Sequence, residues 1–198
     1  MPYKPNQREY RSFDMQLEPQ PIEGGYIVEG YATTFDVPYD FGYDGVKECI
    51  RSTALDGADL SDVIFQLNHE GQTLARLRNG SMQLETDAHG LKVRADLGGS
   101  TAGRDLYEAI KSGLIDKMSW GFAVARDGWE YDPDTRTSYV NKVSKVFDVS
   151  AVSIPADADT EIHARSYLDG VIEAEKQELL SRDREERQRA ALKLRLMK

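Results

Sequence analysis

The sequence has 198 residues and a net charge of −9, with 40% hydrophobic and 30% charged residues. A chain of this length accommodates one domain with a substantial core, plus an appendage. It contains no apolar run near the roughly 18 residues of a transmembrane helix and no apolar segment typical of a secretory signal near its start. Membrane association is therefore not expected.

The acidic charge lies ahead of residue 169, because residues 169–198 hold eight Lys or Arg and seven Asp or Glu. An acidic body argues against phosphate contacts, so nucleic acid is not an expected partner. The single cysteine, Cys49, excludes an internal disulfide framework and fits a reducing cytoplasm. We interpret it as a small buried hydrophobic residue.

Most of the first 155 residues have the periodicity of β-strands. The predicted strands are residues 12–18, 26–35, 63–67, 81–85, 91–97, 117–126, 138–146 and 147–154. Residues 87–90 have the composition of a hairpin turn between two of these strands. One helix is predicted at residues 103–113, where Leu106 and Ile110 recur at helical spacing and Gly113 provides a stop.

Many short strands with few helices predict a mainly β domain of the α+β class. We expect a closed or nearly closed antiparallel β-barrel with peripheral helices over residues 1–165. From about residue 166, dense charges surround sparse apolar pairs, which predicts a charged helical C-terminal tail over residues 166–198. This tail is either a solvated amphipathic helix without a specific role or a segment for oligomerisation or docking.

Ser119 lies in the predicted strand 117–126 on a face of small residues, with Gly121 and Ala123 after it on the same face. A serine beside a glycine leaves room for a substrate backbone to approach the hydroxyl. Small residues also fill the tapering interior of barrels, so a structural serine remains the alternative. The G-x-S-x-G turn of α/β-hydrolases does not occur around Ser119.

His69 follows a predicted strand, and Asp148 begins another that is otherwise apolar or small. A histidine at a strand end can exchange protons near neutral pH, although it can equally be a surface residue. It has no second ligand at metal-binding spacing, so neither a metal nor a cofactor is expected. A buried Asp148 needs a partner, and a histidine is a natural one. An edge-strand aspartate in water is the alternative.

Four segments of the chain, in this order, resemble the prohead protease family of tailed bacteriophages. They are Glu29-Gly30-Tyr31-Ala32-Thr33-Thr34-Phe35, Asn68-His69, Met118-Ser119-Trp120-Gly121-Phe122 and residues 148–156. The resemblance covers residues 25–160 and implies the fold of the herpesvirus assemblin proteases. It also implies that Ser119 is the nucleophile and His69 the general base. Asp148, where many family members have glutamate, would be the third member.

The resemblance implies a serine endopeptidase that cleaves scaffold segments of the phage major capsid protein, and itself, during prohead maturation. Its place would be the immature procapsid in the host bacterial cytoplasm. The expected partners are the capsid protein or scaffold as substrate and further copies of the chain, in a dimer or larger homo-oligomer. The sequence leaves the oxyanion donors open, with residues 98–100 and Arg104 as candidates. The alternative function is a non-catalytic scaffold or capsid-assembly module.

Overall fold

The computed structural model describes residues 8–13, 18–19, 25–43 and 45–153, together with several residues between 173 and 189. Lys4–Ile162 form one compact unit, and Met1–Tyr3 with His163–Lys198 form a second. In the second unit, the described residues have helical backbone and exposed side chains. The remainder of the tail predicted at residues 166–198 lies outside the described residues, so its role stays a prediction.

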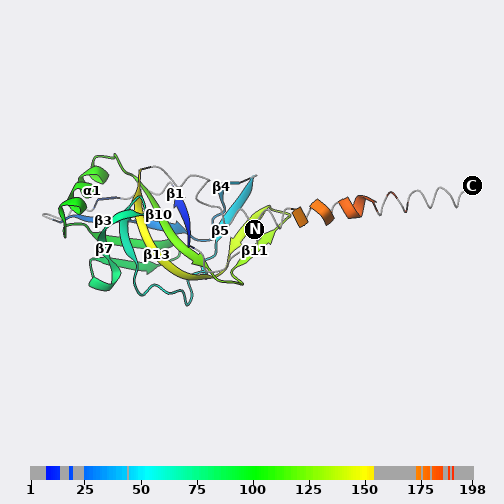
Figure 1. Ribbon diagram of the computed structural model, residues 1–198, viewed down its shortest axis with the longest axis horizontal. Coiled ribbons are helices and arrows are strands. Elements are labelled where there is room, and N and C mark those ends of the chain that lie inside the picture. Colours follow the sequence, from blue (N-terminus) through cyan, green and yellow to red (C-terminus); the bar gives the residue numbers. More distant parts are fainter. Residues whose placement is uncertain are drawn as a thin grey trace, which may run out of the picture. The chain divides into compact units, whose positions relative to one another are not determined.

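The first unit is mainly β-structure (Figure 1). Its strands are β1 (Arg8–Phe13), β2 (Glu18–Pro19), β3 (Ile27–Thr34), β4 (Tyr39–Tyr43), β5 (Val46–Ile50), β6 (Ile64–Leu67), β7 (Glu70–Arg76), β8 (Met82–Thr86), β9 (Gly90–Asp96), β10 (Lys117–Val124), β11 (Trp129–Asp132), β12 (Thr137–Val140) and β13 (Val143–Val152). A short 3-10 helix covers Leu77–Asn79. The predicted mainly β character is therefore confirmed.

The helix α1 (Thr101–Lys111) begins after Ser100, whose side chain accepts a hydrogen bond from the backbone of the first turn. Such a cap satisfies an N–H group that has no partner within the helix. The helix buries Leu106 and Ile110, the residues whose spacing predicted a helix at 103–113. In the described part of the chain, no helix is both long enough and apolar enough to span a bilayer.

The strands form three sheets with the orders β1-β10-β13-β6-β7, β11-β12-β5-β4 and β2-β3-β9-β8. The predicted closed antiparallel barrel is not what the described strands form. A barrel requires every strand to pair on both sides, whereas β1 and β7 each have one partner in their sheet. Two ladders, β13 with β6 and β12 with β5, are parallel.

One hydrophobic core joins the sheets. It collects apolar side chains from β3, β9, β10, β13 and α1, and β3 packs against β10 and β1. In strand β10, which pairs on both sides, Met118, Trp120 and Phe122 belong to this core. Because successive side chains of a strand point to opposite faces, Ser119 and Gly121 lie on the other face of the five-stranded sheet.

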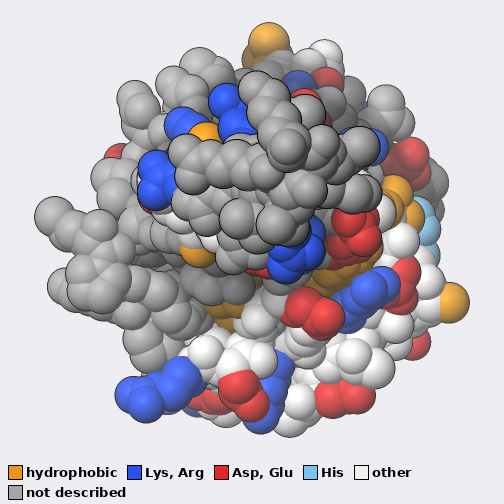
Figure 2. All heavy atoms as spheres, turned by 90° about the vertical axis from the view of Figure 1, so that its right-hand side faces the viewer, with side chains coloured by type: hydrophobic (Ala, Val, Ile, Leu, Met, Phe, Trp, Pro, Cys, Tyr) orange, Lys and Arg blue, Asp and Glu red, His pale blue; other side chains and the backbone are white. Residues whose placement is uncertain are grey.

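The surface carries charges of both signs. On the face shown in Figure 2, the basic and acidic side chains of the described residues are interspersed. Exposed ion pairs elsewhere in the fold include Lys145 with Asp59, at 2.7 Å between Nζ and Oδ2. Pairs of this kind typically contribute little stability, so we ascribe the fold's stability to the shared core.

Candidate active site

Ser119 lies in β10, the second strand of the five-stranded sheet. It stands opposite Ser12 of β1 on one side and Ser150 of β13 on the other, and its side chain is fully buried. The regular antiparallel pairing on both sides fixes the direction of its side chain. The hydroxyl therefore projects from the face of the sheet that does not form the core.

His69 lies in the two-residue turn that joins β6 to β7, after Asn68. Both residues have positive φ, 52° for Asn68 and 60° for His69, and Leu67 pairs with Glu70 across the turn. A two-residue hairpin favours such left-handed residues, and asparagine tolerates them well. The Asn68 Oδ1 accepts a hydrogen bond from the backbone N of Ser153 at 3.0 Å. This bond ties the turn to the end of β13.

The three residues proposed from the sequence come together. His69 Nε2 lies 2.6 Å from Ser119 Oγ, and His69 Nδ1 contacts Asp148 Oδ2. An ionised carboxylate only accepts hydrogen bonds, so Nδ1 carries the proton and Nε2 is left to accept from the serine hydroxyl. This is the order of nucleophile, base and orienting carboxylate found in catalytic triads.

The Ser119 hydroxyl has a second possible acceptor. Its Oγ lies 2.9 Å from the carbonyl oxygen of Arg11 in β1, a bond in which the hydroxyl donates. Because the hydroxyl has one hydrogen, Arg11 O and His69 Nε2 compete for it. Strand β1 thus contacts the Ser119 side chain directly.

Asp148 is fully buried and has three side-chain partners. Its Oδ2 contacts His69 and accepts a hydrogen bond from Ser150 Oγ at 2.9 Å, while its Oδ1 pairs with Arg8 Nη2. Burial alone raises the pKa of a carboxyl group, but His69 and Arg8 together outweigh it and hold the pKa of Asp148 below its usual value. Asp148 is therefore an ionised carboxylate at neutral pH.

Residues 14–171 match the family described as Caudovirus prohead serine protease. The chain belongs to this family. It is 31% identical over 146 residues to the prohead protease of Enterobacteria phage HK97, in a match that covers 73% of this chain and 62% of the relative. The chain thus spans about three fifths of the length of that curated relative.

A solved structure of the bacteriophage T4 capsid assembly protease is also similar. The match has a TM-score of 0.48 and 16% sequence identity, and covers 76% of this chain and 100% of that one. Ser119, His69 and Asp148 lie within the matched residues 14–171. Strand β1 precedes the matched residues, and it supplies further groups to the site.

Sequence reasoning missed the contribution of β1. The ring of Tyr10 lies against His69, with 4.3 Å between the ring centroids, and the guanidinium of Arg8 lies 5.0 Å from the Tyr10 ring centroid. The first residues of the chain are polar and lack a motif. Only a correct prediction that β1 pairs with β10 would have placed Arg8 and Tyr10 beside His69.

For the candidate oxyanion donors from the sequence, residues 98–100 and Arg104, the structure gives some partners near the start of α1. Arg104 Nη1 donates to the carbonyl oxygen of Gly98 at 2.7 Å, and the Ser100 side chain caps α1. These contacts tie the Arg104 guanidinium and the Ser100 hydroxyl to the start of the helix. The oxyanion donors stay unassigned.

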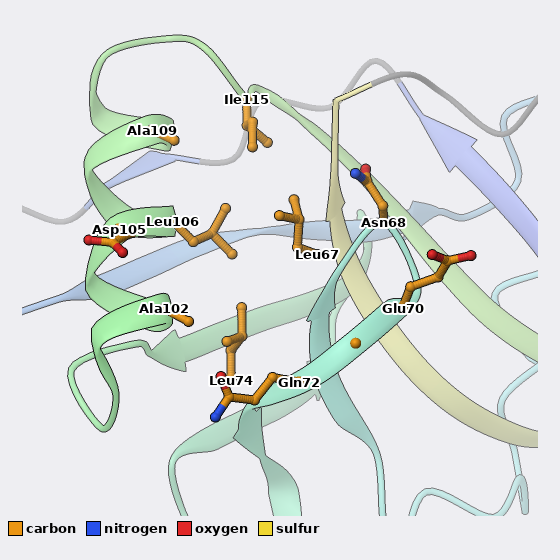
Figure 3. A pocket seen from close by; sticks show the side chains of 11 residues that line it. Leu67, Asn68, Glu70, Gln72, Leu74, Ala102, Asp105, Leu106, Ala109 and Ile115 are labelled. Atoms are coloured by element: carbon orange, nitrogen blue, oxygen red, sulfur yellow. The ribbon is translucent and has the colours of Figure 1, made fainter.

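A pocket of about 560 Å³ lies between α1 and the β6–β7 hairpin (Figure 3). Leu67, Leu74 and Leu106 line it, and Asn68 and Glu70, which flank the catalytic histidine candidate, lie at one edge. Ser119, His69 and Asp148 are not among the residues that line this pocket.

Proposed function

We propose that this chain is a serine endopeptidase of capsid maturation in which Ser119 is the nucleophile, His69 the general base and Asp148 the orienting carboxylate. The observation that carries the proposal is the 2.6 Å approach of His69 Nε2 to Ser119 Oγ, with Nδ1 of the same ring on Asp148. Membership of a family described as serine proteases supports the same chemistry.

The proposed reaction is acyl transfer. Ser119 Oγ attacks the carbonyl carbon of a peptide bond while its proton passes to His69 Nε2, and Asp148 stabilises the imidazolium that forms. The tetrahedral intermediate collapses as the imidazolium protonates the departing amine, which leaves an ester on Ser119. A water molecule then attacks this ester, giving its proton to His69, and the serine recovers that proton as the carboxylic acid product departs.

Substrate access requires a local rearrangement. Ser119 is fully buried, and β1 lies beside it with the Arg11 carbonyl on its hydroxyl and the Tyr10 ring on His69. A peptide therefore reaches Oγ only when the groups that cover Ser119 move. A non-catalytic assembly module would show the same burial. Such a module is therefore the second candidate function.

For substrates, we propose scaffold segments of the phage major capsid protein and the chain itself, cleaved inside the immature procapsid in the host cytoplasm. The family description as prohead proteases and the name of the HK97 relative support this choice. We further propose that the chain acts as a dimer or larger homo-oligomer, which would place several sites near the capsid protein.

Covalent labelling tests the catalytic assignment. A fluorophosphonate probe, which reacts with activated serines, should label the wild-type chain at a single residue, Ser119. Ser119→Ala should abolish labelling, and His69→Ala should slow it strongly. The matched control is Ser138→Ala, because Ser138 is equally buried but lies in a different sheet. Equal labelling of wild type and Ser119→Ala would favour the non-catalytic assembly module.

Cleavage of the proposed substrate is a separate test. Purified capsid protein carrying its scaffold segment should be cut by the wild-type chain within assembled procapsids, and not by Ser119→Ala. Mass spectrometry of the products would identify the scissile bonds, including any in the protease itself. If the chain reacts with the fluorophosphonate but does not cleave the capsid protein in procapsids, the proposed serine hydrolase chemistry stands and the proposed substrate is wrong.

A further inference from the structure

The ion pair between Arg8 and Asp148 joins strand β1 to the proposed catalytic residues. We propose that Arg8 is a positioning residue that acts through Asp148, and that β1 thereby completes the catalytic unit. This inference rests on the proposed serine protease function. It goes beyond the family match, because Arg8 precedes the matched residues 14–171.

The first argument is geometric. Asp148 Oδ2 is shared by His69 Nδ1 and Ser150 Oγ, while Oδ1 pairs with Arg8 Nη2. A carboxylate that is held through only one of its oxygens can rotate about the Cβ–Cγ bond. Since Arg8 holds the second oxygen, it fixes the plane of the carboxylate and hence the direction in which Oδ2 meets the histidine ring.

The second argument concerns charge. A general base must be neutral before it accepts a proton. If Arg8 were absent while His69 is neutral, Asp148 would be a fully buried anion without a counterion. Leaving a buried charge uncompensated is strongly unfavourable. Arg8 is permanently positive, so it compensates Asp148 in the resting state, before the imidazolium forms. The carboxylate is thus ready for the reaction and is not lost to protonation.

The third argument is the space provided for the pair. Arg8 packs its guanidinium between the rings of Tyr10 and Phe147, at 5.0 and 5.1 Å from their centroids. Next to the Arg8–Asp148 pair lies Gly121 of β10, which has no side chain. A Cβ there would lie 2.2 Å from Asp148 Oδ1 and 2.9 Å from Arg8 Nε. Residues of β1, β10 and β13 therefore leave the space that this ion pair occupies.

Strand β1 is itself firmly held. Arg11 is buried and donates to Glu9 Oε2 at 2.7 Å and to Glu48 Oε2 at 2.8 Å. Glu48 belongs to β5, in a different sheet from β1. This cluster anchors β1 across two sheets, so that the position of Arg8 is set by the fold and not by the ion pair alone.

The test measures labelling by the fluorophosphonate probe as a maximal rate and a half-saturating concentration, in the full-length chain. Arg8→Gln should lower the maximal rate about 10- to 100-fold, the range expected when an orienting partner is lost, and leave the half-saturating concentration unchanged. Arg8→Lys, which keeps the charge, should recover most of the rate. The matched control is Arg76→Gln, since Arg76 has the same 36% exposure and also pairs with an aspartate.

A double-mutant cycle separates positioning from a general structural role. In the Asp148→Asn background, Arg8→Gln should cause little further loss, because its effect passes through Asp148. If the rate losses of Arg8→Gln and Asp148→Asn multiply in the double mutant, the proposal is overturned. It is also overturned if Arg8→Gln changes only the half-saturating concentration, because Arg8 would then contact the probe. A wild-type chain that is not labelled at all would overturn the proposed function itself.

Folding controls accompany these measurements. If Arg8→Gln unfolds, Arg8→Met keeps the apolar packing on Tyr10 and Phe147 while removing the charge, and the same criteria apply. Loss of the maximal rate with an unchanged melting temperature supports the proposal. If neither neutral variant folds while Arg8→Lys does, the charge is required for the fold, and the positioning role is overturned.

Discussion

Gly121 lies directly opposite Asp148 in the ladder between β10 and β13, and a Cβ at Gly121 would come within 2.2 Å of Asp148 Oδ1. Real Cβ atoms essentially never come within 3.0 Å of such a neighbouring atom. The absence of a side chain at position 121 is therefore a condition for the observed position of the carboxylate. In the sequence, the same glycine looked like space for a substrate backbone.

Gly121→Ala should inactivate the chain largely without unfolding it. The added methyl group must displace Asp148, the Arg8 side chain or both, which breaks the alignment with His69; a small misplacement of catalytic groups can cost about 100-fold. Fluorophosphonate labelling with a melting curve checks this. The matched control is Ala123→Gly, on the same face of β10, which should label at nearly the wild-type rate. Full activity in Gly121→Ala would show that Asp148 can shift freely.

Asp148→Asn should lower the rate by about 10³- to 10⁴-fold, because an amide does not hold Nδ1 of His69 in the protonated tautomer as a carboxylate does. Asp148→Glu keeps the carboxylate and should retain measurable activity, although the longer side chain must fit a filled site. Peptidase assays on both variants check this. Wild-type activity in Asp148→Asn would reduce the catalytic unit to Ser119 and His69.

The stability that Asp148 contributes should depend on pH. Burial raises its pKa, yet His69 and Arg8 hold the pKa of the folded state below the usual value. Such a group stabilises the fold at pH values above its unfolded pKa of about 3.9, and this contribution is lost as the pH falls through the folded pKa. We expect the difference in unfolding free energy between wild type and Asp148→Asn to shrink from about pH 6 to about pH 2. Urea unfolding at several pH values measures it, and a constant difference would contradict the prediction.

Arg11→Met should destabilise the fold by about 3–5 kcal/mol, because it leaves buried carboxylates without their counterion. Glu48 is fully buried and Glu9 nearly so. Arg78→Met serves as the control, since Arg78 is 68% exposed and its ion pair should contribute at most about 1 kcal/mol. Urea denaturation of the three proteins tests this. A loss in Arg11→Met no larger than in the control would mean that β1 is held by its backbone pairing alone.

The sequence predicted those strands whose apolar residues alternate cleanly, such as 26–35 and 91–97, which correspond to β3 and β9. It missed β5, because Glu48 makes that segment look exposed. In the structure, Glu48 is buried against Arg11, which lies 37 positions away. A pattern of apolar residues cannot reveal a charge that is neutralised by a distant partner.

The same limit applies to the sheets and the site. Alternation indicates which face of a strand is buried, but not which strands pair. The predicted closed barrel was therefore wrong even where strands such as β3, β9 and β10 were found, and β4, β7 and β11 were missed. Ser119, His69 and Asp148 were predicted from the resemblance and do lie together. Arg8 was missed because 140 positions separate it from Asp148 and no motif marks it.

The ladder between β1 and β10 pairs residues that are more than 100 positions apart, with Arg8 opposite Ala123. A ribosome makes β1 first, yet this strand finds its place only after β10 and β13 have emerged. Pairings between distant segments also form slowly. The site can therefore be complete only after β10 and β13 have been synthesised. A protease assembled in this order would be inert as a nascent chain, and the growing polypeptides around it would be spared.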